Sequence, residues 1–390
     1  MDADLAAQRL SRLRKVMCDS AAEFILTADP INITYATGLR NMNVFSMMGA
    51  TRFLLIAAEG PVIMWEYVGA EHLAAGLSTI DEVRPAPGVT ALSGAPYLDA
   101  CRAFAAELAA ACDASVTSRV QLAVERMDHE ITDALRAAGF DLISATPVFV
   151  ESRRLKLAGE VAAMYEAMHR VEGAVEEMLL SLRPGATEIE VWSEFHRHLI
   201  AHDGEYVSTR LVQAGERTFP YFQEAGPHRL ELGDLFCIDT DAIGLGGYAV
   251  DFSRTYLVGG GPAAPPLREL HTLSKHQLEH NAQLLTPGRS FEDFAARAWT
   301  VPDRHAPYAY SCLAHGLGMS GEYPYVPVLQ PDQYPLDGAF EAGMVVCVES
   351  YIGDAAVARG VKLENQYLIT DSGAEVMSSL GFDPAFDSPE

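Results

Sequence analysis

Hydrophobic residues follow two different periods along the first 150 positions of the chain. Some segments repeat apolar side chains every 3.6 residues, which predicts amphipathic helices, and others are short apolar runs closed by turn residues, which predict strands. The helical segments are residues 6–17, 97–114 and 131–140, and the β-type runs are 23–28 and 53–58. Strands alternating with helices predict an α/β layer built on a mixed sheet.

The pattern changes near residue 152, where we place a boundary between domains 1–152 and 153–390. Long helices ending at Pro-Gly pairs come first, and the start of the second one has Thr187 and Glu190 in capping-box spacing. Strands follow and return near the end of the chain. The predicted helices are 160–182, 187–200, 266–285 and one from Ser290, and the predicted strands are 205–214, 235–241, 247–258, 343–352 and 361–370.

Composition and charge narrow the class of protein. Hydrophobic residues make up 49% of the 390 positions and charged residues 21%, as in ordinary globular proteins. A formal net charge of −25 argues against nucleic acid or an anionic membrane as a partner. Scattered cysteines, a first helix unlike a signal peptide and the lack of a long apolar run predict a cytoplasmic protein with reduced thiols.

Three aspartates lie in an apolar, hairpin-like run at residues 236–256. Asp239 and Asp241 share one face of a strand because side chains alternate, and the glycine-rich turn after them brings Asp251 alongside. No lysine is seen among them, so the converging carboxylates would repel one another strongly. The alternative is three solvated turn residues, but a divalent cation explains their apolar surroundings better.

Two further strand-like runs and one glycine-rich segment contain the other candidate metal ligands. Glu349 lies in MVVCVES, Glu364 in VKLENQYLIT and His315 in AHGLGMSGEYP. Glutamates in core strands are rarely left unpaired, although a single histidine is more often a structural residue. Oxygen-rich ligation with one imidazole suits iron, manganese, cobalt or zinc, in a site for one or two ions.

The order Asp–Asp–His–Glu–Glu resembles that of the pita-bread metalloenzymes, which include aminopeptidase P, prolidase and creatinase. The stretches ADPINITYATG, RLKLAGEVAAM and LRPGATEIEV are also similar to segments of that family. The resemblance implies a creatinase-like N-terminal α/β domain and a C-terminal pita-bread catalytic domain, that is, an α/β (α+β) fold.

Three departures from the peptidase pattern disfavour peptide hydrolysis. Threonine stands at position 240 between two aspartates, the segment RLVQAGERTFPYF has no histidine, and Glu322 replaces a histidine that follows the metal-ligating one. This altered set resembles the dimethylsulfoniopropionate (DMSP) lyase branch of the family, as do GEYVSTRL, KLENQ and FDPA. Carried over, the metal ligands are Asp239, Asp241, Asp251, His315, Glu349 and Glu364, with iron favoured.

The resemblance implies β-elimination from a small zwitterionic substrate, giving dimethyl sulfide and acrylate. The substrate carboxylate would meet the metal, and aromatic rings would face the sulfonium. Ring candidates are Tyr221, Phe222, Tyr310, Tyr323 and Tyr325, with Tyr310 and Tyr323 preferred. The branch has an aspartate at the position of Gly321, so Glu322 or Tyr310 is expected to act as the base.

Two other hypotheses stay open at this point. One is a metal-dependent hydrolase that cleaves a C–N bond in a dipeptide or small zwitterion, like prolidase or creatinase. The other is a non-catalytic binding module, which six intact ligand positions disfavour. The resemblance also implies a homodimer.

Overall fold

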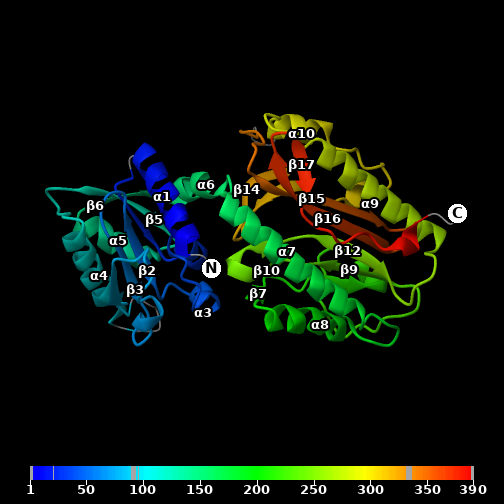
Figure 1. Ribbon diagram of the computed structural model, residues 1–390, viewed down its shortest axis with the longest axis horizontal. Helices are drawn as coiled ribbons and strands as arrows, with labels where there is room; N and C mark the ends of the chain where they lie inside the picture. Colours follow the sequence, from blue (N-terminus) through cyan, green and yellow to red (C-terminus); the bar gives the residue numbers. More distant parts are fainter. Residues whose placement is uncertain (1–2, 21, 89–93, 95, 331–335, 388–390) are drawn as a thin grey trace. The chain divides into compact units, whose positions relative to one another are not determined.

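The computed structural model describes residues 3–20, 22–88, 94, 96–330 and 336–387 of the chain. Contacts divide the chain into two compact units, Met1–Arg153 and Arg154–Glu390. Each unit has its own sheets, helices and hydrophobic core (Figure 1).

The N-terminal unit is built on one six-stranded sheet in the order β4-β3-β2-β1-β5-β6. β1 pairs antiparallel with β2 and parallel with β5, so the sheet is mixed, and the expected α/β class is confirmed. The strands are β1 (Phe24–Thr27), β2 (Phe53–Ala57), β3 (Val62–Glu66), β4 (Glu82–Pro85), β5 (Val120–Glu125) and β6 (Phe140–Ser144). The helices are α1 (Ala3–Asp19), α2 (Pro30–Thr37), α3 (Asn43–Met47), α4 (Tyr97–Ala111), α5 (His129–Ala138) and α6 (Thr146–Arg153), with a 3-10 turn η1 (Glu71–Leu73).

Helix α4 shows why this unit packs as it does. Its buried residues include Cys101, Phe104 and Leu108, spaced three and four apart on one face. The Phe104 ring lies 4.8 Å from that of Phe53 on β2 and 5.4 Å from that of Trp65 on β3. The apolar stripe predicted from sequence is therefore the surface that covers the sheet.

The C-terminal unit combines four longer helices and short helical turns with eleven strands among the described residues. The helices are α7 (Ala158–Leu179), α8 (Glu188–Ala201), α9 (Pro265–Gln283) and α10 (Phe291–Arg297), with 3-10 turns η3 (Gly215–Thr218), η4 (Leu245–Gly247), η5 (Ala306–Tyr308) and η6 (Pro384–Phe386). The strands are β7 (Tyr206–Val207), β8 (Val212–Ala214), β9 (Leu235–Asp239), β10 (Ala242–Ile243), β11 (Ala249–Val250), β12 (Ser253–Leu257), β13 (Cys312–Leu317), β14 (Gly321–Pro327), β15 (Val345–Asp354), β16 (Arg359–Thr370) and β17 (Gly373–Val376).

The predicted capping box at the start of α8 is present. The Thr187 side chain accepts a hydrogen bond from the Glu190 amide, and the Glu190 carboxylate accepts one from the Thr187 amide. This reciprocal pair satisfies two amide donors that a helix start leaves open. α7 and α8 pack together, and α9 covers β15 and β16 (Figure 1).

The strands form three sheets whose order brings distant segments together. The largest is β14-β13-β15-β16-β17, and the two smaller ones are β12-β9-β8 and β11-β10-β7. β12 lies against β16, which places the hairpin beside the C-terminal strands. Two predicted strands, 205–214 and 247–258, are each broken into two short strands in the structure.

The gap in the second of these predicted strands lies opposite an irregular stretch of backbone in its partner. Asp241 adopts the left-handed conformation with φ of +38°, so the chain leaves the extended path between β9 and β10. Asp251 and Phe252 form the matching gap opposite, between β11 and β12. Within the described part of the chain, no helix combines the length and apolarity needed to cross a bilayer.

Candidate metal centre

The predicted ligands lie at the ends or in the middle of strands in the C-terminal unit, and the pairing of these strands brings them together. Asp239 ends β9 and pairs in register with Ser253 of β12. Glu349 of β15 lies directly opposite Glu364 of β16, so both side chains leave the same face of the sheet. His315 comes from the neighbouring strand β13.

The imidazole of His315 faces three carboxylates. Its Nε2 lies 3.5 Å from Glu349 Oε1, 3.5 Å from Glu364 Oε1 and 3.7 Å from Asp251 Oδ2. One oxygen of each carboxylate therefore converges on a single nitrogen from a different strand. Such a set offers the mixed nitrogen and oxygen donors that bind divalent transition metals.

The three aspartates of the hairpin form a second, overlapping group. Asp239, Asp241 and Asp251 each offer an oxygen within 4.8 Å of the others. Asp241 Oδ2 accepts a hydrogen bond of 2.6 Å from the Thr209 hydroxyl, which fixes its orientation. Asp251 belongs to both groups, so it stands between two possible ion positions.

The hydrogen bonding of the donor atoms indicates whether a metal ion fits this site. Asp251 Oδ1 and Glu364 Oε1 are buried carboxylate oxygens that accept no hydrogen bond in the structure. A buried acceptor without a partner is costly, and a bound cation would satisfy both oxygens. The residues present therefore fit one or two divalent cations.

Cys347 is a member of the centre that sequence reasoning passed over. Its Sγ lies within 4.8 Å of donor atoms of Asp251, His315 and Glu364. The signal was available, because Cys347 precedes Glu349 by two residues on β15 and therefore points to the same face. Its thiol lies 3.6 Å from the carbonyl oxygen of Asp251, to which it donates.

Lys362 is the larger omission, and it corrects the expectation that no lysine lies among the carboxylates. Its side chain is buried, with Nζ 3.1 Å from Asp239 Oδ2, 2.6 Å from Glu349 Oε2 and 2.9 Å from Glu364 Oε2. The sequence did contain the signal, since Lys362 precedes Glu364 by two residues in the strand VKLENQ. The counter-charge does not lie within the hairpin of residues 236–256, because Lys362 belongs to the facing strand β16.

Burial and crowding shift the pKa values of the carboxyls in opposite directions. Burial, together with the charge of Asp239, raises the pKa of Asp241 to about 7. Burial and the charge of Glu364 raise the pKa of Asp251 well above its usual range. Burial alone would raise the pKa of Asp239, but the Lys362 ammonium and a hydrogen bond from Tyr221 lower it to about 2.

The raised pKa of Asp241 predicts that metal binding depends on pH. The ordinary pKa of an aspartate is 3.8, so between about pH 4 and 7 the folded, metal-free protein keeps a proton that the unfolded chain loses. The folded state therefore loses stability as the pH rises through this window, and a divalent ion must displace that proton to bind. Asp251, whose pKa is raised as well, must also release its proton, so below pH 7 we expect affinity for Mn²⁺ to rise at least tenfold per pH unit, as measured by titration calorimetry at pH 5.5, 6.5 and 7.5. Equal affinities at the three pH values would contradict this prediction, and Asp241→Asn should lessen the dependence.

Three aromatic candidates gather beside the carboxylates. The ring centroids of Tyr221 and Phe222 lie 4.5 Å apart, and each lies within 5.6 Å of the Tyr310 ring. The Tyr221 hydroxyl donates a short hydrogen bond to Asp239 Oδ2. Lys362 Nζ lies 5.5 Å from the Tyr221 centroid and 5.8 Å from that of Tyr310, so these rings already face a cation.

The other two aromatic candidates have different surroundings. The Tyr323 ring packs edge-on against Phe291, and its hydroxyl donates to the carbonyl oxygen of Asp337. Tyr323 is thus part of the packing around the core of this unit. Tyr325 lies opposite His315 in the strand register, but its side chain is 59% exposed.

The predicted base Glu322 is engaged in structural contacts. Its Oε2 forms an ion pair of 3.1 Å with Lys156 Nζ, and its Oε1 accepts a hydrogen bond from the Met319 amide. Both oxygens have partners, and the pair is almost completely buried. The other candidate, Tyr310, has a pKa raised by burial and by the charge of Glu349, which keeps its hydroxyl protonated and so not available as a base. Neither Glu322 nor Tyr310 is therefore in surroundings that favour accepting a proton.

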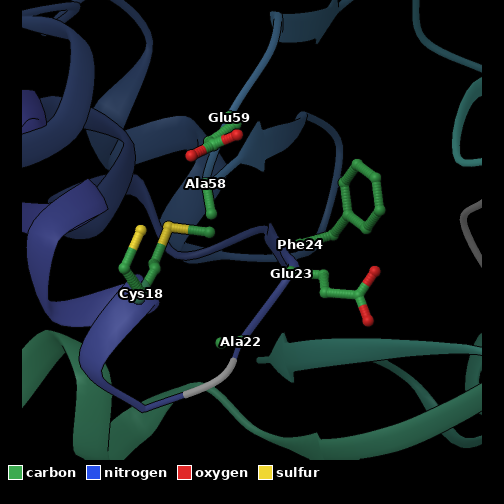
Figure 2. A pocket seen from close by; sticks show the side chains of 7 residues that line it. Cys18, Ala22, Glu23, Phe24, Ala58 and Glu59 are labelled. Carbon is green, nitrogen blue, oxygen red and sulfur yellow. The ribbon is translucent and has the colours of Figure 1, made fainter.

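A separate hollow of about 490 Å³ lies in the N-terminal unit (Figure 2). Figure 2 shows Cys18 beside Ala58 and Glu59, with Glu23 and Phe24 on the adjoining strand segment. None of the predicted site residues lines this hollow.

Comparisons with known proteins place this architecture in a family. The profile of Metallopeptidase family M24 matches residues 162–371. The chain is 33% identical to the dimethylsulfoniopropionate lyase DddP of Roseovarius nubinhibens, over 97% of this chain and 86% of that protein. It is 31% identical to the DddP of Roseobacter denitrificans, over 98% of this chain and 88% of that protein.

A solved structure shows the same fold. The recombinant prolidase from Thermococcus sibiricus superposes with a TM-score of 0.78 at 19% identity and covers 98% of both chains. The pita-bread fold expected from the ordered acidic residues and histidine is therefore confirmed. The chain belongs to metallopeptidase family M24.

Proposed function

We propose that this protein is a metal-dependent lyase that cleaves DMSP, or a closely related zwitterion, into dimethyl sulfide and acrylate. One observation carries the proposal: an aromatic group, Tyr221, Phe222 and Tyr310, adjoins a centre of buried carboxylates. A cation-binding centre suits the carboxylate of a zwitterion, and aromatic rings suit its onium group. Identity to two DMSP lyases over nearly the whole chain supports the same choice of substrate.

Phe222 strengthens the case for an aromatic binding surface. It holds a left-handed backbone conformation with φ of +68°, which is costly for a bulky side chain. Its ring is 59% exposed, so little packing repays that cost. A strained, exposed aromatic next to half-buried rings is typical of a ligand contact.

The reaction breaks the C–H bond next to the carboxylate and the C–S bond beyond it. The electron pair of the C–H bond forms the double bond of acrylate, and the pair of the C–S bond leaves with dimethyl sulfide. A divalent cation, when bound, supplies Lewis-acid polarisation of the substrate carboxylate. Tyr221, Phe222 and Tyr310 hold the sulfonium, and the released proton passes to a base, for which Glu322 and Tyr310 are the candidates.

The metal ligands are proposed to be Asp239, Asp241, Asp251, His315, Glu349 and Glu364. We further propose that residues 153–390 form the catalytic domain, that iron is the preferred ion over manganese, cobalt and zinc, and that the protein is a cytoplasmic homodimer. The convergence of these side chains supports the ligand set. The family resemblance supports iron and the homodimer, the change of pattern near residue 152 supports the domain boundary, and the scattered cysteines support the cytoplasmic location.

The test is an activity screen on the purified protein. The protein is incubated with DMSP and Fe²⁺, Mn²⁺, Co²⁺ or Zn²⁺ in turn, dimethyl sulfide is measured by headspace gas chromatography, and acrylate by liquid chromatography. We expect equimolar products with at least one ion and none after chelation. The lyase proposal fails if no ion gives dimethyl sulfide while the protein is folded and metal-loaded.

The second candidate is a C–N hydrolase acting on a dipeptide or small zwitterion. Membership of a metallopeptidase family favours it, as do dipeptidases 25–26% identical over about 60% of this chain. Release of free proline from Xaa-Pro dipeptides in the same screen would establish it. The sequence favours the lyase because the segment RLVQAGERTFPYF has no histidine where peptidases are expected to carry one.

A further inference from the structure

We propose that Glu188 is a positioning residue that holds Phe222 beside the metal centre. Its carboxylate joins the two ends of the aromatic loop, which we define as residues 214–226 and which carries Tyr221 and Phe222. The inference rests on the proposed function, because that function assigns the Phe222 ring to the onium group of the substrate.

The burial of Glu188 is not explained by its own helix. Glu188 is the first residue of α8, and its side chain is completely buried. The capping box at this helix start is formed by Thr187 and Glu190, so it makes no use of the Glu188 carboxylate. A buried carboxylate is costly unless donors surround it, and the donors to Glu188 come from the aromatic loop.

Both ends of the aromatic loop are hydrogen-bonded to this one carboxylate. The amide of Ala214, where the loop begins, donates a hydrogen bond of 2.8 Å to Glu188 Oε1. The amide of Gly226, where the loop ends, donates one of 2.9 Å to Oε2. Each oxygen therefore holds one end, and both oxygens are needed to fix the separation of the two ends.

Arg217 adds a second connection inside the aromatic loop. Its Nε lies 3.0 Å from Glu188 Oε1 and 3.2 Å from Oε2, and its Nη2 donates a hydrogen bond of 2.7 Å to the carbonyl oxygen of Glu224. Arg217 precedes the two rings in the chain and Glu224 follows them. Hydrogen bonds of charged groups are about twice as strong as neutral ones, so the Glu188–Arg217 pair restrains both sides of the loop.

Phe222 is the ring that depends most on this restraint. The segment before the rings is fixed independently, because the Thr218 carbonyl accepts a hydrogen bond from the Tyr351 hydroxyl. Tyr221 is held by its hydrogen bond to Asp239. Phe222, in contrast, is exposed and has a left-handed backbone, a conformation that persists only where the surroundings enforce it.

Glu188→Gln is expected to release at least one end of the aromatic loop. The side-chain amide carries hydrogens where the carboxylate had an acceptor, and these would face the amide of Ala214 or that of Gly226. With Phe222 less fixed, the bound substrate and the transition state lose the same contact. KM for DMSP should therefore rise about fivefold while kcat stays within about twofold. The amides of residues 219–226 should exchange with solvent at least about tenfold faster.

The experiment combines a double-mutant cycle with hydrogen exchange, both on the metal-loaded protein. KM and kcat for DMSP are measured for the wild type, Glu188→Gln, Phe222→Ala and the double variant, and exchange is followed by mass spectrometry. If Glu188 acts through Phe222, the double variant has the KM of Phe222→Ala alone, whereas independent effects would multiply. Should Glu188→Gln fail to fold, Arg217→Met removes the second connection and is expected to give the same pattern.

Glu172→Gln serves as the matched control. Glu172 is also a buried glutamate of the C-terminal unit, and it holds residues 378–380 through hydrogen bonds from their amides and hydroxyls. That segment carries no proposed ligand or ring. The control should therefore lower the melting temperature without changing KM or the exchange of residues 219–226.

Three results would overturn the role of Glu188. They are an unchanged KM in folded Glu188→Gln, an equal rise of KM in Glu172→Gln, and a double variant in which the two effects multiply. If the wild type forms no dimethyl sulfide, the lyase proposal fails by itself. The exchange of residues 219–226 then still decides whether Glu188 holds the aromatic loop, and exchange equal to that of the wild type would refute it.

Discussion

Replacing His315 by alanine is expected to lower kcat/KM for DMSP by about 10³-fold or more, because the metal supplies several kcal/mol of transition-state stabilisation. Nε2 of His315 is the nitrogen on which Asp251, Glu349 and Glu364 converge. Without it, the ion loses its imidazole ligand and three carboxylates lose their common partner. Metal content after dialysis and headspace gas chromatography measure the two consequences.

The control for this prediction is His276→Ala. His276 is an exposed histidine on α9, in the same unit, so its loss should change neither metal content nor activity. Circular dichroism shows whether the His315 variant is folded. A folded His315→Ala protein with full metal content and wild-type activity would remove His315 from the centre.

Introducing an aspartate at Gly321 is expected to raise kcat for dimethyl sulfide release about 10²-fold, the lower end of the usual contribution of general base catalysis. Both candidate bases are poorly prepared, since Glu322 is paired with Lys156 and the pKa of Tyr310 is raised. A Cβ added at Gly321 meets no atom within 4 Å, and the backbone there lies outside the left-handed region, so the fold should tolerate the change.

The matched control for this variant is Gly321→Asn, which has the same shape and no basic carboxylate. We expect the aspartate variant alone to gain activity, with the gain lost below the pKa of the new carboxyl. Equal rates for the two variants and the wild type would show that position 321 does not face the substrate.

Much of the fold follows from local patterns in the sequence. The stripe of Cys101, Phe104 and Leu108 faces the first sheet as its period predicts, and Thr187 caps α8 as its spacing with Glu190 predicts. These features depend on residues close together in the chain, where period and spacing are sufficient. The unpredicted helices α2, α3 and α6 are short, and their sequences carry little periodicity.

The metal centre could be predicted because charged residues within apolar strands are easy to recognise in a sequence. Carboxylates at 239, 251, 349 and 364 interrupt apolar strands, and the structure brings all four side chains to one place. What local patterns could not supply was the pairing of strands. Lys362 on β16 compensates Asp239 on the neighbouring strand β9, 123 positions away in the chain, and no spacing rule links the two.

The aromatic residues show the same limit. Tyr323 is close to His315 in sequence, yet its ring packs on Phe291, while Tyr221, almost 100 positions earlier, donates to Asp239. Proximity in sequence could not show that Tyr221 contacts Asp239, because β-strand partners are set by tertiary pairing. The break at Asp241 was missed for a related reason, since its left-handed backbone depends on the sheet around it.

The claim on which everything else depends is that side chains from four strands close around divalent ions. A crystal of the protein soaked in Mn²⁺, with diffraction recorded above and below the manganese absorption edge, tests it directly. We predict an anomalous difference peak between His315 Nε2, Asp251 and Glu364. A map with full manganese in the crystal but no peak within ligand distance of His315 would contradict the account.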